Sequence, residues 1–77
     1  MTPDVELDCR GLICPQPVIE LGRAIAKIAI GQVIGVTATD PATRYDVPAW
    51  CRMKHQEFLG EQDSEDGVPM FLVRRVS

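Results

Sequence analysis

The sequence predicts an α/β protein of the α+β type: a two-layer sandwich with the order βαβαββ, in which a mixed four-stranded sheet carries two helices on one face. Three patterns indicate this fold. The first half reads as strand, helix and strand, a second helical stretch follows, and two extended runs flank a turn near the end. The chain has 77 residues, of which 45% are hydrophobic and 25% charged. This composition is typical of a folded globule, and we expect residues 1–77 to form one domain.

The first strand is expected at residues 5–8, VELD, where apolar and acidic residues alternate. Val5 and Leu7 would point inward, and the two acidic residues would point toward water. The segment CRGLIC at 9–14 then predicts a loop that turns at Gly11.

The first helix is indicated by apolar residues at helical spacing, namely Val18, Leu21, Ile25 and Ile28. It would be about 14 residues long and end near Gly31, which can adopt the left-handed cap conformation. The β-branched run QVIGVTATD at 32–40 predicts a second strand. Strand, helix and strand in this order form a βαβ unit with parallel strands and a right-handed crossover.

The second helix is expected within DPATRYDVPAWCRM, with Asp46 as its N-cap and Pro48 in its first turn. It should stop near His55. Its inner face would consist of Val47, Trp50, Cys51 and the stem of Lys54.

The last part of the chain predicts an antiparallel hairpin. Residues 57–64 can form a third strand, EDG at 65–67 a turn, and VPMFLVRRV at 68–76 a fourth strand. The third strand alternates only weakly between apolar and polar residues, so its register is not determined by the sequence.

Charge and cysteine content exclude several classes of function. The net charge is −3, which argues against direct binding of nucleic acid through a basic surface. The N-terminal segment lacks the pattern of a signal peptide, and the longest uncharged run, 28–39, is too short for a membrane span. Three cysteines suit a reducing compartment, so we expect a cytoplasmic protein. Their spacing does not match a zinc site, and no metal or other cofactor is expected.

The segment LICPQP is the strongest candidate for a functional site. Cys14 precedes a proline, so it should lie outside the first helix as its N-cap, with Pro15 and Pro17 fixing the first turn. The N–H groups of Gln16 and Val18 would then face the mouth of the helix. The positive end of the helix dipole should lower the pKa of Cys14, and Arg10 could add positive charge. The alternative is that Cys14 packs as a small apolar residue.

The segment LDCRGLICPQPVIEL resembles the signature of the TusA/SirA family of small sulfur-carrier proteins, whose motif is Cys-Pro-x-Pro at the start of the first helix. DPATRYDVPAWC, the EDG turn and the FLVRR ending are similar to later segments of that family, so the resemblance covers residues 5–75. It implies the two-layer βαβαββ fold. It also implies that Cys14 carries sulfur as a persulfide, taken from a cysteine desulfurase or a rhodanese-type donor and passed to an acceptor protein.

The resemblance also assigns supporting residues. Pro15 and Pro17 match the motif prolines, Gly11 matches the glycine of the preceding loop, and Asp40 matches the acidic residue after the second strand. A carboxylate before PAT is equally explained as a turn or cap residue. Gln16 departs from members that have an acidic residue between the prolines. Gly22 and Arg23 stand where a member is basic, so its donor contacts need not all transfer.

Three functions remain open on the sequence alone. The first is a sulfur relay for a biosynthetic pathway such as tRNA thiolation. The second is the same carrier chemistry in sulfur oxidation or thiosulfate handling, and the third is a non-catalytic regulatory interaction module.

Other residues have weaker claims to a function. Cys9 could resolve a persulfide on Cys14, and His55 could act as an acid or base. Both have structural explanations as well, and Cys51 is expected to be buried beside Trp50. The acidic run at 61–66 is interpreted as a solvated turn, or as a face that docks a partner.

Overall fold

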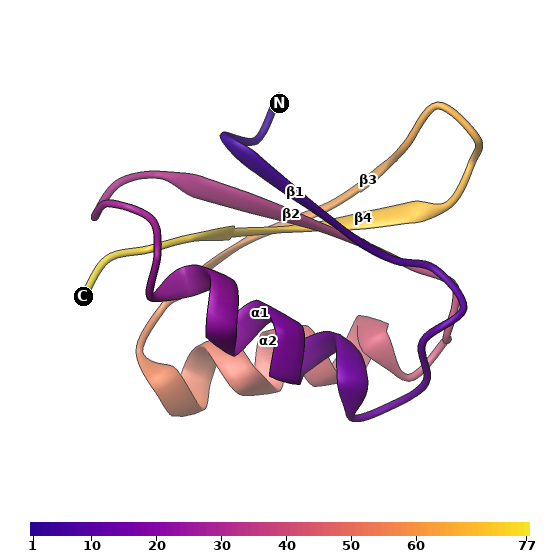
Figure 1. Ribbon diagram of the computed structural model, residues 1–77, viewed down its shortest axis with the longest axis horizontal. Coiled ribbons are helices and arrows are strands. Elements are labelled where there is room, and N and C mark those ends of the chain that lie inside the picture. The colour runs from indigo at the N-terminus through magenta and orange to yellow at the C-terminus, as the bar shows by residue number, and fades with distance from the viewer.

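In the computed structural model, which describes residues 1–77, a twisted four-stranded sheet lies over two helices (Figure 1). The predicted class and the order βαβαββ are confirmed. The elements are β1 (Val5–Cys9), α1 (Gln16–Ile25), β2 (Val33–Ala38), α2 (Thr43–Lys54), β3 (Glu57–Asp63) and β4 (Pro69–Arg74).

The sheet is mixed, as predicted, with the strand order β1-β2-β4-β3. β1 and β2 are parallel, whereas β4 is antiparallel to both β2 and β3. The register of the hairpin shifts between Phe58 and Gly60. This irregularity explains the weak alternation of β3, because an extra residue in one strand turns the following side chains to the other face.

The core lies between the sheet and the helices. Leu21 is fully buried, and Ile25 and Ile28 are also buried, so the predicted inner face of the first helical segment is confirmed. From α2, the core receives Val47, Trp50 and Cys51. Lys54 is exposed and takes no part in that face, contrary to the prediction.

α1 is shorter than predicted, since it ends at Ile25 and not near Gly31. The N–H of Lys27 donates to the carbonyl of Ala24 at 3.0 Å, a tight three-residue bond that closes the helix. Gly31 does have a positive φ of 96°. It lies in the turn before β2, where its N–H donates to Arg75 at 2.7 Å.

α2 begins at Thr43, so the prediction that Asp46 is its N-cap is wrong. The side chain of Asp40 accepts the N–H of Ala42 at 3.0 Å and thereby supports the helix start from farther upstream. Pro48 consequently lies inside the helix and not in its first turn, where it was predicted. The helix stops as predicted at His55, which has the left-handed φ of 58°.

Neither α1 nor α2 has the length and apolar character of a helix that crosses a membrane.

Candidate functional site

Cys14 lies at the end of the molecule where β1 and β2 finish and α1 and α2 begin (Figure 1). The parallel pairing places Cys9 opposite Ala38 at the ends of the two strands. The loops that follow these strands are therefore neighbours, although 26 residues separate Cys14 from Asp40. The Cys14 thiol is exposed and free.

The carboxylate of Asp40 connects the Cys14 loop to the start of α2. One oxygen accepts the backbone N–H of Cys14 at 2.8 Å, and the other accepts the N–H of Ala42 at 3.0 Å. These two bonds lower the pKa of Asp40, because they stabilise its charged form. Asp40 thus holds the backbone of Cys14. This contact is consistent with the supporting role that the family resemblance implies for Asp40.

Gly11 anchors the same loop at a second point. Its φ of 82° is in the left-handed region, which glycine adopts without a steric penalty. Its N–H donates to the hydroxyl of Thr39 at 3.0 Å, immediately after β2. The loop before Cys14 is consequently bound to the end of β2 through Thr39 and Asp40.

The first turn of α1 differs by one residue from the prediction. The helix begins at Gln16 with Pro15 as its N-cap residue, so Cys14 precedes the cap and lies in a turn. The N–H of Gln16 donates to the carbonyl of Ile13 at 2.9 Å and does not face the thiol. Pro17 is buried at the second helical position, where its missing N–H costs the helix no hydrogen bond.

The pKa of the Cys14 thiol is raised, and the predicted lowering is wrong. The main cause is a hydrogen bond with the side chain of Asp46, followed by desolvation and by the negative charges of Asp46 and Asp40. Both the carboxylates and the desolvation favour the protonated form of the thiol. Arg10 does not offset them, because its guanidinium pairs with Asp8 and Asp66.

Asp46 is therefore a residue of the site. The sequence predicted it only as a helix cap and not as a neighbour of Cys14. With α2 beginning at Thr43, Asp46 lies in its first turn, on the end of the helix that meets Cys14. The available signal was the DPAT segment itself, which resembles a capped helix start. A helix that begins just after this segment has Asp46 in its first turn.

The other candidate residues lie away from this exposed edge. Cys9 and Cys51 are free but buried, with exposed fractions of 1% and 2%. Burial raises the pKa of both thiols, to about 11 for Cys51. His55 caps the opposite end of α2. The structure thus brings together Gly11, Cys14, Pro15, Pro17, Asp40 and Asp46.

The Cys14 thiol lies outside the two best-defined hollows of the molecule. Cys14 lines neither the large groove on the far face of the sheet nor the hollow of about 150 Å³ beside Asp40. Two exposed apolar side chains adjoin residues of the site in the sequence. Ile13 precedes Cys14 and Tyr45 precedes Asp46, and each is 74% exposed. An exposed apolar rim of this kind suits contact with another protein.

A single exposed thiol at an edge of the molecule, with its backbone N–H bound by Asp40, is an arrangement suited to the transfer of a group between proteins. The comparisons specify the family. Residues 5–75 match the family described as "Sulfurtransferase TusA". The "Sulfur carrier protein TusA" of Pseudomonas entomophila (strain L48) is 42% identical over 72 residues, with 94% of this chain and 89% of the relative covered. The chain belongs to the TusA family of sulfur carriers, so the resemblance is confirmed.

Two further comparisons agree. The "Sulfur carrier protein TusA" of Pseudomonas syringae pv. syringae (strain B728a) is 39% identical over 77 residues, with 100% of this chain and 90% of the relative covered. The crystal structure of a SirA-like protein from Desulfitobacterium hafniense superimposes with a TM-score of 0.79 at 20% identity, and covers 95% of this chain and 99% of its own. That likeness supports the fold.

Proposed function

We propose that Cys14 carries sulfur as a persulfide. The donor is a cysteine desulfurase or a rhodanese-type protein, and the recipient is a downstream protein of tRNA 2-thiouridine synthesis. The observation that carries the proposal is the free, exposed thiol of Cys14, whose backbone N–H is bound by Asp40 at 2.8 Å in a chain of the sulfur-carrier family. Residues 1–77 act as one carrier domain.

The chemistry requires two exchanges at sulfur. In loading, the Cys14 thiolate attacks the outer sulfur of a donor persulfide, the donor's S–S bond breaks, and the donor leaves as a thiolate. Cys14 then holds the outer sulfur with its proton. In delivery, an acceptor thiolate attacks that outer sulfur, and Cys14 leaves as a thiolate. No net oxidation occurs, and no metal or organic cofactor takes part.

The raised pKa of Cys14 makes both exchanges depend on the partner. Asp46 and Asp40 hold the resting thiol in its protonated form, which is the unreactive form. A partner that places a cation beside these carboxylates would favour the thiolate, because a nearby positive charge stabilises the charged form of the thiol. We therefore propose that docking activates Cys14 and that the free carrier reacts slowly.

The surroundings of Cys14 fit docking to proteins and not to nucleic acid. Ile13 and Tyr45 offer apolar contact area, and the net charge is −3. Free thiols persist in a reducing compartment, and we place the protein in the cytoplasm. The tRNA would then be held by the acceptor protein.

The proposal is tested by intact mass after incubation with a cysteine desulfurase and free cysteine. We expect the wild-type chain to gain one sulfur atom that a reductant removes. Cys14→Ser, matched in size, should gain none while unfolding at the same denaturant concentration as the wild type. An equal gain in Cys14→Ser would exclude Cys14 as the carrying residue.

The pathway is tested in cells. We expect a strain that lacks the protein to lose 2-thiouridine from its tRNA, and only a gene with Cys14 intact to restore it. Unchanged 2-thiouridine with impaired use of thiosulfate would instead support sulfur oxidation or thiosulfate handling. Full function of Cys14→Ser would support the interaction module.

A further inference from the structure

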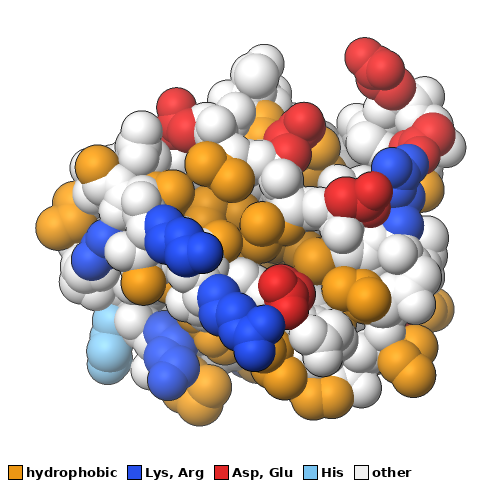
Figure 2. All heavy atoms as spheres, viewed as in Figure 1, with side chains coloured by type: hydrophobic (Ala, Val, Ile, Leu, Met, Phe, Trp, Pro, Cys, Tyr) orange, Lys and Arg blue, Asp and Glu red, His pale blue; other side chains and the backbone are white.

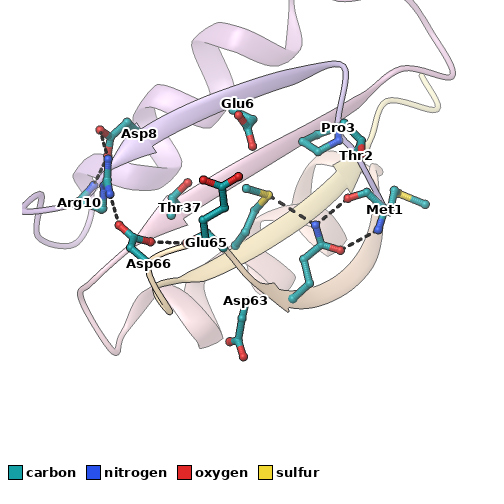
Figure 3. Close-up of a pocket in the computed structure, with 13 residues that line it drawn as sticks. Met1, Thr2, Pro3, Glu6, Asp8, Arg10, Thr37, Asp63, Glu65 and Asp66 are labelled. Carbon is teal, nitrogen blue, oxygen red and sulfur yellow. Dashed lines mark hydrogen bonds and ion pairs between the residues drawn. The ribbon is translucent and has the colours of Figure 1, made fainter.

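The face of the sheet that the helices leave uncovered contains a groove of about 730 Å³. Its walls are the N-terminal segment on one side and the β3–β4 turn on the other (Figure 3). Gly35 makes the floor possible: a Cβ there would lie 2.7 Å from Met70 Sδ and 2.9 Å from Pro3 Cγ. These two side chains can therefore pack across the middle of β2 only because residue 35 has none.

The groove is acidic. Five carboxylates line it, against one arginine and the amino group of Met1: Glu6, Asp8, Asp63, Glu65 and Asp66. Arg10 is occupied by Asp8 and Asp66, and its hydrogen bonds hold the pKa of Asp8 at about 2. The Met1 amino group donates to Gln62 at 3.0 Å.

Three carboxylates that line the groove have no cation within the chain, and two of them, Glu6 and Glu65, point into it. Glu6 and Glu65 make neither an ion pair nor a hydrogen bond within the chain, and Figure 3 shows both side chains turned into the groove, whereas Asp63 turns away. In Figure 2 several acidic side chains lie over the sheet and its hairpin, with one basic side chain among them, and most basic side chains lie lower, with one acidic side chain beside them. The groove is thus an unneutralised part of the surface.

A separate feature of the groove is the side chain of Thr37. Thr37 is only 8% exposed, and its hydroxyl makes no hydrogen bond within the chain. Its position in β2 directs the side chain to the uncovered face, and Figure 3 shows the hydroxyl pointing into the groove between Asp66 and Glu65. Its oxygen is not one of the chain's fully buried unpaired atoms, so it is open to the groove and can accept a donor that comes from outside the chain.

We propose that this groove binds a lysine or arginine side chain from an extended segment of a partner protein, with Glu6 and Glu65 facing its charge and Thr37 accepting one of its N–H donors. The lining is suited to an organic cation and not to a metal, because no three ligating side chains are placed to hold a metal ion.

The position of the groove favours a cation borne by a protein, an argument that rests on the proposed carrier function. Its β3–β4 wall lies at the same end of the molecule as the loop between β1 and α1, which contains Cys14 (Figure 1). A protein that docks on Cys14 could reach over this end into the groove. The groove would give such a partner a second contact, remote from the reacting sulfur.

Binding is tested by NMR titration of the Cys14→Ser chain, so that the result does not depend on sulfur loading. The probe is a blocked peptide with two lysines separated by one glycine, and the same peptide with both lysines acetylated is its neutral counterpart. We expect amide signals of Glu6, Thr37 and Glu65 to shift with the cationic peptide alone, less strongly at high salt.

Substitutions then separate the groove from net charge. Glu6→Gln with Glu65→Gln should weaken binding about fivefold to tenfold, the effect of two partly exposed ion pairs. Thr37→Val should weaken it about threefold at unchanged charge, the effect of one hydrogen bond. Glu57→Gln, which removes a carboxylate outside the groove, should leave the affinity unchanged.

Three results would overturn the proposal. Shifts spread over the whole surface, or equal weakening by Glu57→Gln, would mean that only net charge attracts the peptide. Equally tight binding of 1,4-diaminobutane would make the groove a site for free organic cations and not for a protein segment. Loss of sulfur loading in Cys14→Ser has no bearing on these results, so the two proposals fail separately.

Discussion

Leu21→Ala is expected to destabilise the protein strongly, because Leu21 attaches α1 to the sheet. The side chain is fully buried in the core between the layers. The substitution removes three carbon atoms, worth about 0.8 kcal/mol each in transfer, and leaves a cavity, so the expected loss is about 3 to 5 kcal/mol. A domain of this size has a total stability of about 4 to 12 kcal/mol, so the loss is a large share of it.

The assay is urea unfolding followed by the fluorescence of Trp50, the only tryptophan, which is 7% exposed. With a urea slope of about 1 to 3 kcal/mol/M, the midpoint should fall by at least about 1 M. The control is Ile19→Ala in the same helix. Ile19 is 41% exposed, so its loss of about 1.4 kcal/mol of burial is partly offset by the better helix propensity of alanine.

A midpoint for Leu21→Ala equal to that of Ile19→Ala would refute this reasoning. It would mean that the inner face of α1 has been assigned to the wrong residues, and with it the orientation of the helix that begins beside Cys14.

Three further outcomes are expected at the site. Asp46→Asn should lower the pKa of Cys14, because it removes the negative charge and the acceptor that favour the protonated thiol; the pH profile of alkylation by iodoacetamide should move to lower pH, and an unmoved profile would contradict the assigned cause. In the native protein a thiol-counting reagent should find Cys14 alone, and all three cysteines only in urea; a second rapidly reacting thiol would show that the burial of the other two is misassigned. Asp40→Ala should speed amide hydrogen exchange at Cys14, with Asp40→Asn intermediate because its amide oxygen still accepts one bond; unchanged protection would mean that Asp40 does not hold the loop.

The fold was predictable because its signals are local. The helical spacing of Leu21, Ile25 and Ile28 gave the correct buried face, and the alternation in the first strand gave the correct inner residues. Helix ends were less predictable. α2 is supported from Asp40, a residue outside it, so a search for a cap immediately before the helix selected Asp46 instead.

The electrostatics of the site could not be read from the sequence, because they depend on residues far apart in the chain. The raised pKa of Cys14 requires Asp46, which lies on a different helix. Arg10 was expected to assist the thiol, yet it pairs with Asp66 across 56 residues. The groove likewise arises from the N-terminal segment, β2 and the hairpin together, and no single segment indicates it.

The most direct test of the central claim locates the sulfur on the wild-type chain. After loading by a desulfurase and alkylation, trypsin cleavage at Arg10, Arg23, Arg44 and Arg52 gives the peptides 1–10, 11–23 and 45–52, each with one of the three cysteines. We predict that the extra sulfur atom is found on peptide 11–23, which contains Cys14. Extra sulfur on peptide 1–10 or 45–52, or on none of the three, would contradict the account.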